Sequence, residues 1–69
     1  MPLAVANKGV EFEIKRILGN EPVKHHLENL GFVIGTDISI VNEINGNVIV
    51  RIKDSRIAIS KSMAMKIIV

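Results

Sequence analysis

The chain has 69 residues, of which 48% are hydrophobic, and it contains no cysteine, so disulfides and thiolate zinc sites are excluded. This length suffices for a single domain over residues 1–69, and folding at this size buries only about 60% of the surface that the unfolded chain exposes. Nine Lys and Arg against seven Asp and Glu give a net charge of +2. This dispersed excess is too small for a dedicated nucleic-acid or membrane-surface binder, and two Phe without Tyr or Trp offer little for base stacking.

No apolar run approaches the ~20 residues that a membrane-spanning helix needs. The apolar N-terminus, residues 1–6, lacks the basic region with which a signal peptide begins. We therefore expect no direct membrane insertion and a cytoplasmic location.

The first periodic segment has the alternation of a half-buried strand. Val10, Phe12 and Ile14 alternate with charged residues, which predicts one strand over residues 10–17. Its phase breaks toward Gly19, where we expect a bulge or the end of the strand.

The second segment carries the signals of a short α-helix. Asn20 or Glu21 can cap its N-terminus, and Pro22 lies in the first turn, where its missing N–H costs nothing. Gly31 stands where a left-handed residue ends a helix. One apolar stripe recurs at helical spacing along it: Val23, Leu27 and Leu30.

From Ile38 the strand alternation returns and predicts a three-stranded meander. Asn45-Gly46 is the strongest short hairpin signal, and we place the second tight turn at Asp54-Ser55. Ser60 or Ser62 can then cap a single helical turn, and residues 66–69 form a terminal strand. The predicted fold is mostly β: a small SH3-like barrel of five to six strands, which hides its edges by curling, with one short α-helix and a C-terminal helical turn.

Residues 27–35 resemble the signature of FeoA domains, "L-x-x-L-G-hydrophobic-x-P-G". Ile34 replaces the usual Pro, and Lys24 stands where Arg is common, which keeps the charge but not the forked geometry. The resemblance extends over the whole chain, and its motif residues have structural roles: Leu27, Leu30, Gly31, Gly35 and Ala64. We expect Leu27 and Leu30 to pack the helix across an open end of the barrel, and Gly31 and Gly35 to reverse the chain into the strand that begins at Ile38.

The resemblance also implies a function. FeoA is a small cytoplasmic accessory protein of bacterial ferrous iron transport, so we expect this chain to act in iron homeostasis by protein–protein interaction. The implied partner is the FeoB-type permease with its GTPase domain, which this protein would regulate or assemble. We expect no cofactor.

A set of basic residues is the leading candidate for the partner site. Arg51 and Lys53 are predicted to share the outer face of a strand with Ile49, and Arg56 follows the next turn. Two interpretations stay open: a charged edge that prevents strand-to-strand aggregation, or a basic docking surface with Ile49 as its apolar anchor. Lys24 is a further candidate contact.

Phe32, Val33 and Val41 form a second, apolar candidate surface. We expect these side chains to be unusually exposed in so small a fold. An apolar patch there would serve a partner or weak self-association, which makes Phe32 a candidate contact residue.

His25 and His26 are the only imidazoles of the chain. Adjacent helical residues point about 100° apart, so both cannot ligate one metal without distortion. We expect a solvated His25 and a half-packed His26, and assign no metal ligands. The alternative of direct transition-metal binding needs a weak surface site that joins His25 to Glu21, Glu28 or Asn29.

Catalysis has no support in the sequence, so we do not expect an enzyme. There is no Cys nucleophile and no Gly-rich phosphate loop before a helix. A small basic SH3-like barrel that binds nucleic acid stays open as an alternative, although the chain lacks a DNA-reading helix.

Overall fold

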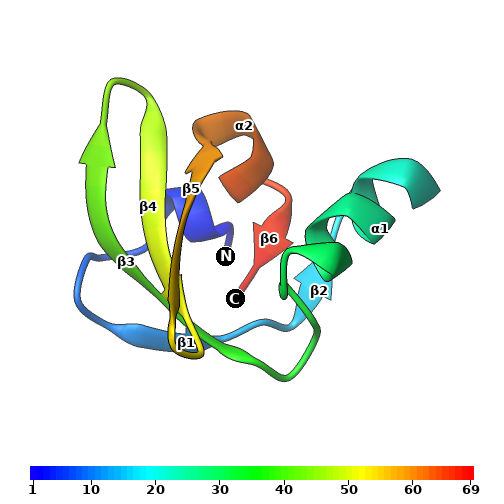
Figure 1. The fold of residues 1–69 in the computed structure, drawn as a ribbon, viewed down its shortest axis with the longest axis horizontal. Coiled ribbons are helices and arrows are strands. Elements are labelled where there is room, and N and C mark those ends of the chain that lie inside the picture. Colours follow the sequence, from blue (N-terminus) through cyan, green and yellow to red (C-terminus); the bar gives the residue numbers. More distant parts are fainter.

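Two antiparallel sheets of unequal size carry the fold of residues 1–69, as a computed structural model describes it (Figure 1). The larger sheet has the strand order β1-β3-β4-β5, and the smaller one pairs β2 with β6. The elements in chain order are the 3₁₀ turn η1 (Leu3–Val5), β1 (Glu11–Glu13), β2 (Arg16–Ile17), α1 (Glu21–Asn29), β3 (Asp37–Ile44), β4 (Asn47–Ile52), β5 (Ser55–Ser60), α2 (Lys61–Ala64) and β6 (Ile67–Ile68).

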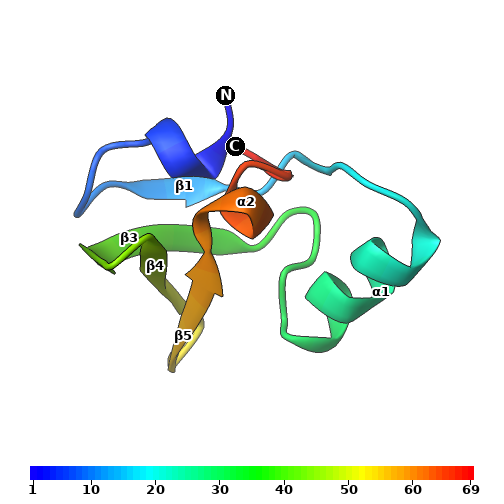
Figure 2. The same cartoon turned by 90° about the horizontal axis from the view of Figure 1, so that it is seen from above.

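This arrangement confirms a mostly β domain with one short helix and a C-terminal helical turn. The six strands do not close into one hydrogen-bonded ring, because β1 and β5 remain the two edges of the larger sheet. Figure 2 shows α1 lying to one side of the sheets. No helix has the length and apolar character that a membrane span requires.

The single strand predicted over residues 10–17 is divided between the two sheets. Ile14 still bonds the β3 side, since its N–H donates to the carbonyl of Thr36 at 2.9 Å. The next amide, of Lys15, donates instead to the carbonyl of Ile68 at 2.7 Å, beside β6. The chain thus changes partners within one residue, and Val10, expected to face inward, is 45% exposed.

The meander forms as predicted, with two shifts. Asn45 and Gly46 both have positive φ, 49° and 79°, as the first hairpin requires. The second turn lies at Lys53-Asp54, one residue earlier than expected, and Lys53 has φ 54°. In β3 the register shifts between Ile40 and Asn42, which reverses the side-chain phase and leaves Ile44 half exposed.

Both helices begin at predicted caps. The Asn20 side chain accepts a hydrogen bond from the Val23 N–H at 3.2 Å, and Ser60 accepts one from the Met63 N–H at the same distance. Leu27 is the one residue of α1 that is fully buried. The core holds twelve side chains: Leu3, Ile14, Leu27, Phe32, Ile38, Ile40, Val48, Val50, Ile52, Ile59, Ala64 and Ile67.

Candidate interaction surface

Strands β4 and β5 bring three of the predicted contact residues together. Their register pairs Arg51 with Arg56 and Ile49 with Ala58, so all four side chains stand on one face of the sheet. Both arginines and Ala58 are exposed, whereas Ile49 is half-buried. We call Ile49, Arg51 and Arg56 the basic face.

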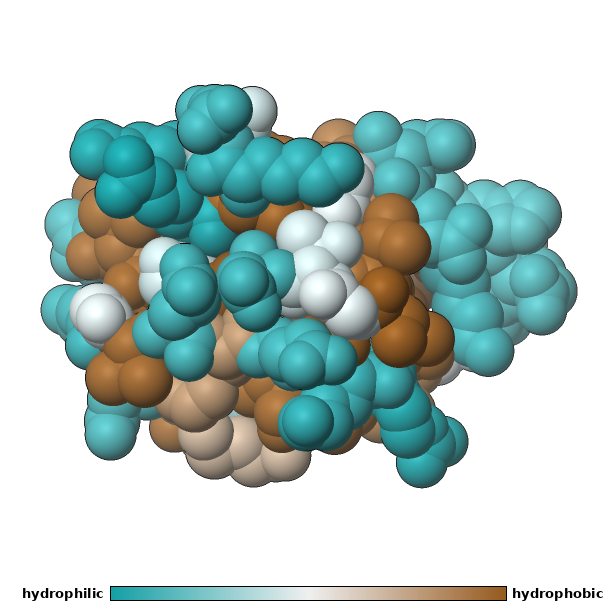
Figure 3. Space-filling model, turned by 90° about the horizontal axis from the view of Figure 1, so that it is seen from below, coloured by the Kyte–Doolittle hydropathy of each residue, from teal (hydrophilic) through white to brown (hydrophobic).

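Lys53 belongs to the turn and not, as predicted, to the strand that carries Arg51. Its side chain still lies beside the basic face, because Lys53 and Arg51 line the same shallow depression of about 510 Å³. No hydrophobic residue lines the depression, and three acids do: its remaining lining residues are Glu11, Thr36, Asp37, Ser39 and Asp54. Figure 3 shows one side of the molecule, on which hydrophilic side chains interleave with hydrophobic ones.

The charges of this sheet are graded from one edge to the other. One row of paired residues runs from Glu11 on β1 through Ser39 and Arg51 to Arg56 on β5. The Lys61–Glu43 ion pair at 3.2 Å and the His25–Glu21 contact at 3.6 Å involve none of these residues. Arg51 and Arg56 therefore form no ion pair within the molecule.

Two like charges directly opposite one another weaken a strand pair. Arg51 and Arg56 are such a pair, and neither is neutralised by an ion pair. The arrangement costs stability and leaves two guanidinium groups free to bind an anionic group from outside.

Phe32 is not a contact residue of any surface, because its side chain is completely buried. The prediction that Phe32 is exposed is wrong, and the cause lies in the hydrogen bonds at the end of α1. Gly31, with φ 103°, donates its N–H to the carbonyl of Glu28, and Phe32 donates to that of Leu27 at 3.0 Å. These two bonds form a Schellman motif, which places the residue after the glycine against the last turn of the helix. The spacing Leu27–Gly31–Phe32 was therefore a usable signal of burial.

Lys24 lies away from the basic face, on α1. It lines a second depression, of about 350 Å³, with Ile17, Glu21, Glu28, Val33 and Ile34. Val33 and Ile34 are exposed here, at 45% and 63%. With Phe32 buried, the predicted apolar surface reduces to Val33 in this depression and Val41, the exposed residue at the register shift of β3.

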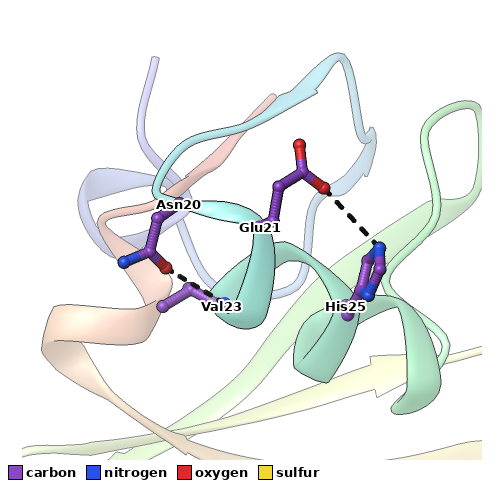
Figure 4. A network of polar contacts seen from close by, with 4 residues as sticks. All are labelled: Asn20, Glu21, Val23 and His25. Atoms are coloured by element: carbon purple, nitrogen blue, oxygen red, sulfur yellow. Dashed lines mark hydrogen bonds and ion pairs between the residues drawn. The ribbon is translucent and has the colours of Figure 1, made fainter.

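The histidines are both exposed, so the half-packed position expected for His26 is wrong. Figure 4 shows His25 on α1 pointing toward Glu21, with 70% and 78% of their side chains exposed. No group of three or more His, Asp or Glu side chains lies in a position to hold a metal ion. This helix offers two hydrated ligands at most, and no buried donor fixes them.

The motif residues lie at the turns that follow α1 and in or against the core. Gly31 and Gly35 have positive φ, and the Gly35 N–H donates to the Ile14 carbonyl at 2.8 Å, which ties the loop after α1 to the end of β1. Ala64 is fully buried and Leu30 packs half-buried against the core.

Comparison with known proteins places the whole chain in one group. The family model described as FeoA domain matches residues 1–69. A protein of Methanocaldococcus jannaschii, named as a candidate Fe(2+) transport protein A, is 38% identical over 68 residues, which are 99% of this chain and 83% of that protein.

Solved structures show the same fold. Iron(II) transport protein A from Clostridium thermocellum matches with a TM-score of 0.90 and 29% identity, over 97% of this chain and 43% of that one. FeoA of Stenotrophomonas maltophilia, solved with zinc and described as an SH3 domain protein, matches with a TM-score of 0.84 and 20% identity, over 99% of this chain and 87% of that one.

Proposed function

Because this chain belongs to the FeoA family and has its SH3-like fold, we propose that it is a cytoplasmic accessory protein that binds the GTPase-bearing part of a FeoB-type permease. It regulates or assembles that transporter by protein–protein contact and catalyses no reaction of its own. Family membership supports the role in ferrous iron transport.

The observation that carries the proposal is the unpaired basic face. Arg51 and Arg56 face each other across β4 and β5 as like charges, and neither forms an ion pair within the molecule. A single charged side chain would be enough to protect the strand edge from aggregation. Two opposed arginines beside the half-buried Ile49 suit a partner that brings an acidic group to an apolar centre.

The same face does not favour a nucleic acid. Its depression contains Glu11, Asp37 and Asp54 next to Arg51 and Lys53. The phosphate backbone of a nucleic acid would be repelled by these three acids while Arg51 and Lys53 attract it. A protein surface can instead place a charge of opposite sign against each of these side chains.

The direct test is binding of the full chain to the soluble domain of the permease, with and without guanine nucleotide. We expect binding that Arg51→Glu and Arg56→Glu each weaken about tenfold or more, since a charge contact replaced by a repulsion costs over 1.4 kcal/mol. Arg16→Glu is the matched control, an exposed arginine on the smaller sheet. Absence of binding in both nucleotide states, or equal binding by all three variants, overturns the proposal.

A further inference from the structure

β5 is a free strand edge. It pairs with β4 through six consecutive residue pairs, from Ser55 to Ser60, and no strand pairs with its other side. Four of its six residues are exposed. Figure 1 shows β5 at the end of the meander, running toward α2.

The register identifies which backbone groups of β5 point outward. The residues that flank a two-residue hairpin loop exchange hydrogen bonds, and such pairs alternate along an antiparallel ladder. Ile52 and Ser55 flank the Lys53-Asp54 turn, so the Arg51–Arg56 and Ile49–Ala58 pairs are those without mutual bonds. The N–H and carbonyl groups of Arg56 and Ala58 therefore point away from β4, and neither residue has a backbone bond elsewhere.

Proteins commonly protect such an edge with a bulge, a proline, a covering helix or several charges. β5 has a continuous register, no proline and one charged residue, Arg56. The opposite edge of the sheet, β1, is only three residues long. The longer edge thus lacks a bulge and a proline and carries a single charge, Arg56, with Arg51 next to it on β4.

We propose that the free edge of β5 binds an extended acidic segment of a partner, which adds to the sheet as a further strand. The outward groups of Arg56 and Ala58 supply main-chain bonds, and Arg56 and Arg51 receive carboxylates that project on the outer face. The inference shares the basic face with the proposed function and in that sense rests on it, but it concerns the mode of binding.

A second copy of this chain fits the edge less well. Two β5 strands meeting across a two-fold axis would bring further arginines together on an already repulsive face. A contact from β5 to β1 of another copy would match the charges of Glu11 and Glu13, but the three residues of β1 offer few main-chain bonds.

The probe is a short capped peptide of alternating valine and glutamate, titrated into the full chain and followed by NMR and amide exchange. We expect shifts confined to β4 and β5, slower exchange of the Arg56 and Ala58 amides, and weaker binding with rising salt. A peptide with lysine in place of glutamate should not bind. A peptide N-methylated at alternate residues, with unchanged charge, should bind about threefold to tenfold more weakly for each lost bond.

Variants of β5 give a second readout. Ala58→Pro removes one outward N–H without breaking a bond to β4, and Ala58→Ser changes the side chain while keeping that N–H. We expect Ala58→Pro to weaken peptide binding about threefold to tenfold, and Ala58→Ser to bind like the parent.

The outcomes separate the two proposals. Three results would overturn the proposal that a partner adds a strand to β5. They are no peptide binding, equal binding by the N-methylated peptide, and protection of β5 that depends on protein concentration without any peptide. If the permease domain binds the Ala58→Pro variant and the parent protein with equal affinity, the inference about β5 fails and the proposed function survives. If the peptide binds but the permease domain does not, the proposed function alone fails.

Discussion

The meander of β3 to β5 and the segment from α1 through Gly35 are held to the molecule in different ways. The meander has two long ladders, of which the one between β4 and β5 is continuous and the one between β3 and β4 is interrupted by a single register shift. It contributes six core side chains: Ile38, Ile40, Val48, Val50, Ile52 and Ile59. The helical segment contributes Leu27 and Phe32 to that core. Figures 1 and 2 both show α1 projecting from the sheets.

The difference teaches where each region can be altered. The stability of the meander is spread over many contacts, so its outer face is free to carry opposed arginines. The helical segment has only two fully buried side chains, Leu27 and Phe32, joined by one Schellman motif, so a single change there has a large effect.

The largest effect is expected at Phe32. Phe32→Ala should cost about 3–5 kcal/mol, because it empties a fully buried site in a domain whose total stability is about 3–10 kcal/mol. Urea unfolding followed by circular dichroism measures this loss. The adjacent Val33→Ala, at a 45% exposed site, should stay within about 0.5 kcal/mol of the parent. Similar costs for both variants would contradict the role given to the buried Phe32 side chain.

A smaller effect is expected at the first hairpin. Gly46→Ala should lower the free energy of unfolding by about 1–2 kcal/mol, because alanine disfavours a φ of 79°. A steric clash does not contribute, since the added Cβ would meet no atom within 4 Å. Gly46→Asn is the control, since asparagine tolerates this conformation, and should lose less. Urea midpoints compare the two variants. An equal loss would mean that the backbone conformation is not the cause.

A comparable but local effect is expected at the start of α1. Asn20→Ala removes the cap on the Val23 amide and should cost about 1 kcal/mol, whereas Asn20→Ser keeps an acceptor. Amide exchange should show faster opening in residues 21–29 and unchanged protection in β4. Uniformly faster exchange would show that α1 and the meander unfold as one unit.

The smallest effect has the opposite sign. Arg56→Glu converts the repulsion across β4 and β5 into an attraction and should stabilise the protein by about 0.5 kcal/mol. The same variant should weaken partner binding, so stability and function change in opposite directions. Urea unfolding at low and high salt tests this, because screening should reduce the gain. A destabilised Arg56→Glu would remove the argument that Arg51 and Arg56 repel each other.

The sequence by itself determined the features that depend on neighbouring residues. Asn20 and Ser60 cap the helices, Asn45-Gly46 turns the first hairpin, and the alternation of β4 sets its buried face, because each of these signals acts within a few residues. Burial of Phe32 belongs to the same class, since the Schellman motif that causes it is local.

Only the tertiary structure decided which strand each segment joins. The chain leaves β3 for β6 between Ile14 and Lys15 because bonding groups from residues far along the chain are available there. The same holds for the basic face: the register of β4 and β5 sets Arg51 opposite Arg56 and turns the outer amides of β5 toward solvent. Local periodicity is compatible with several strand registers, and only the pairing between distant segments selects one of them. The residues of the candidate contact surface are therefore brought together by the tertiary structure.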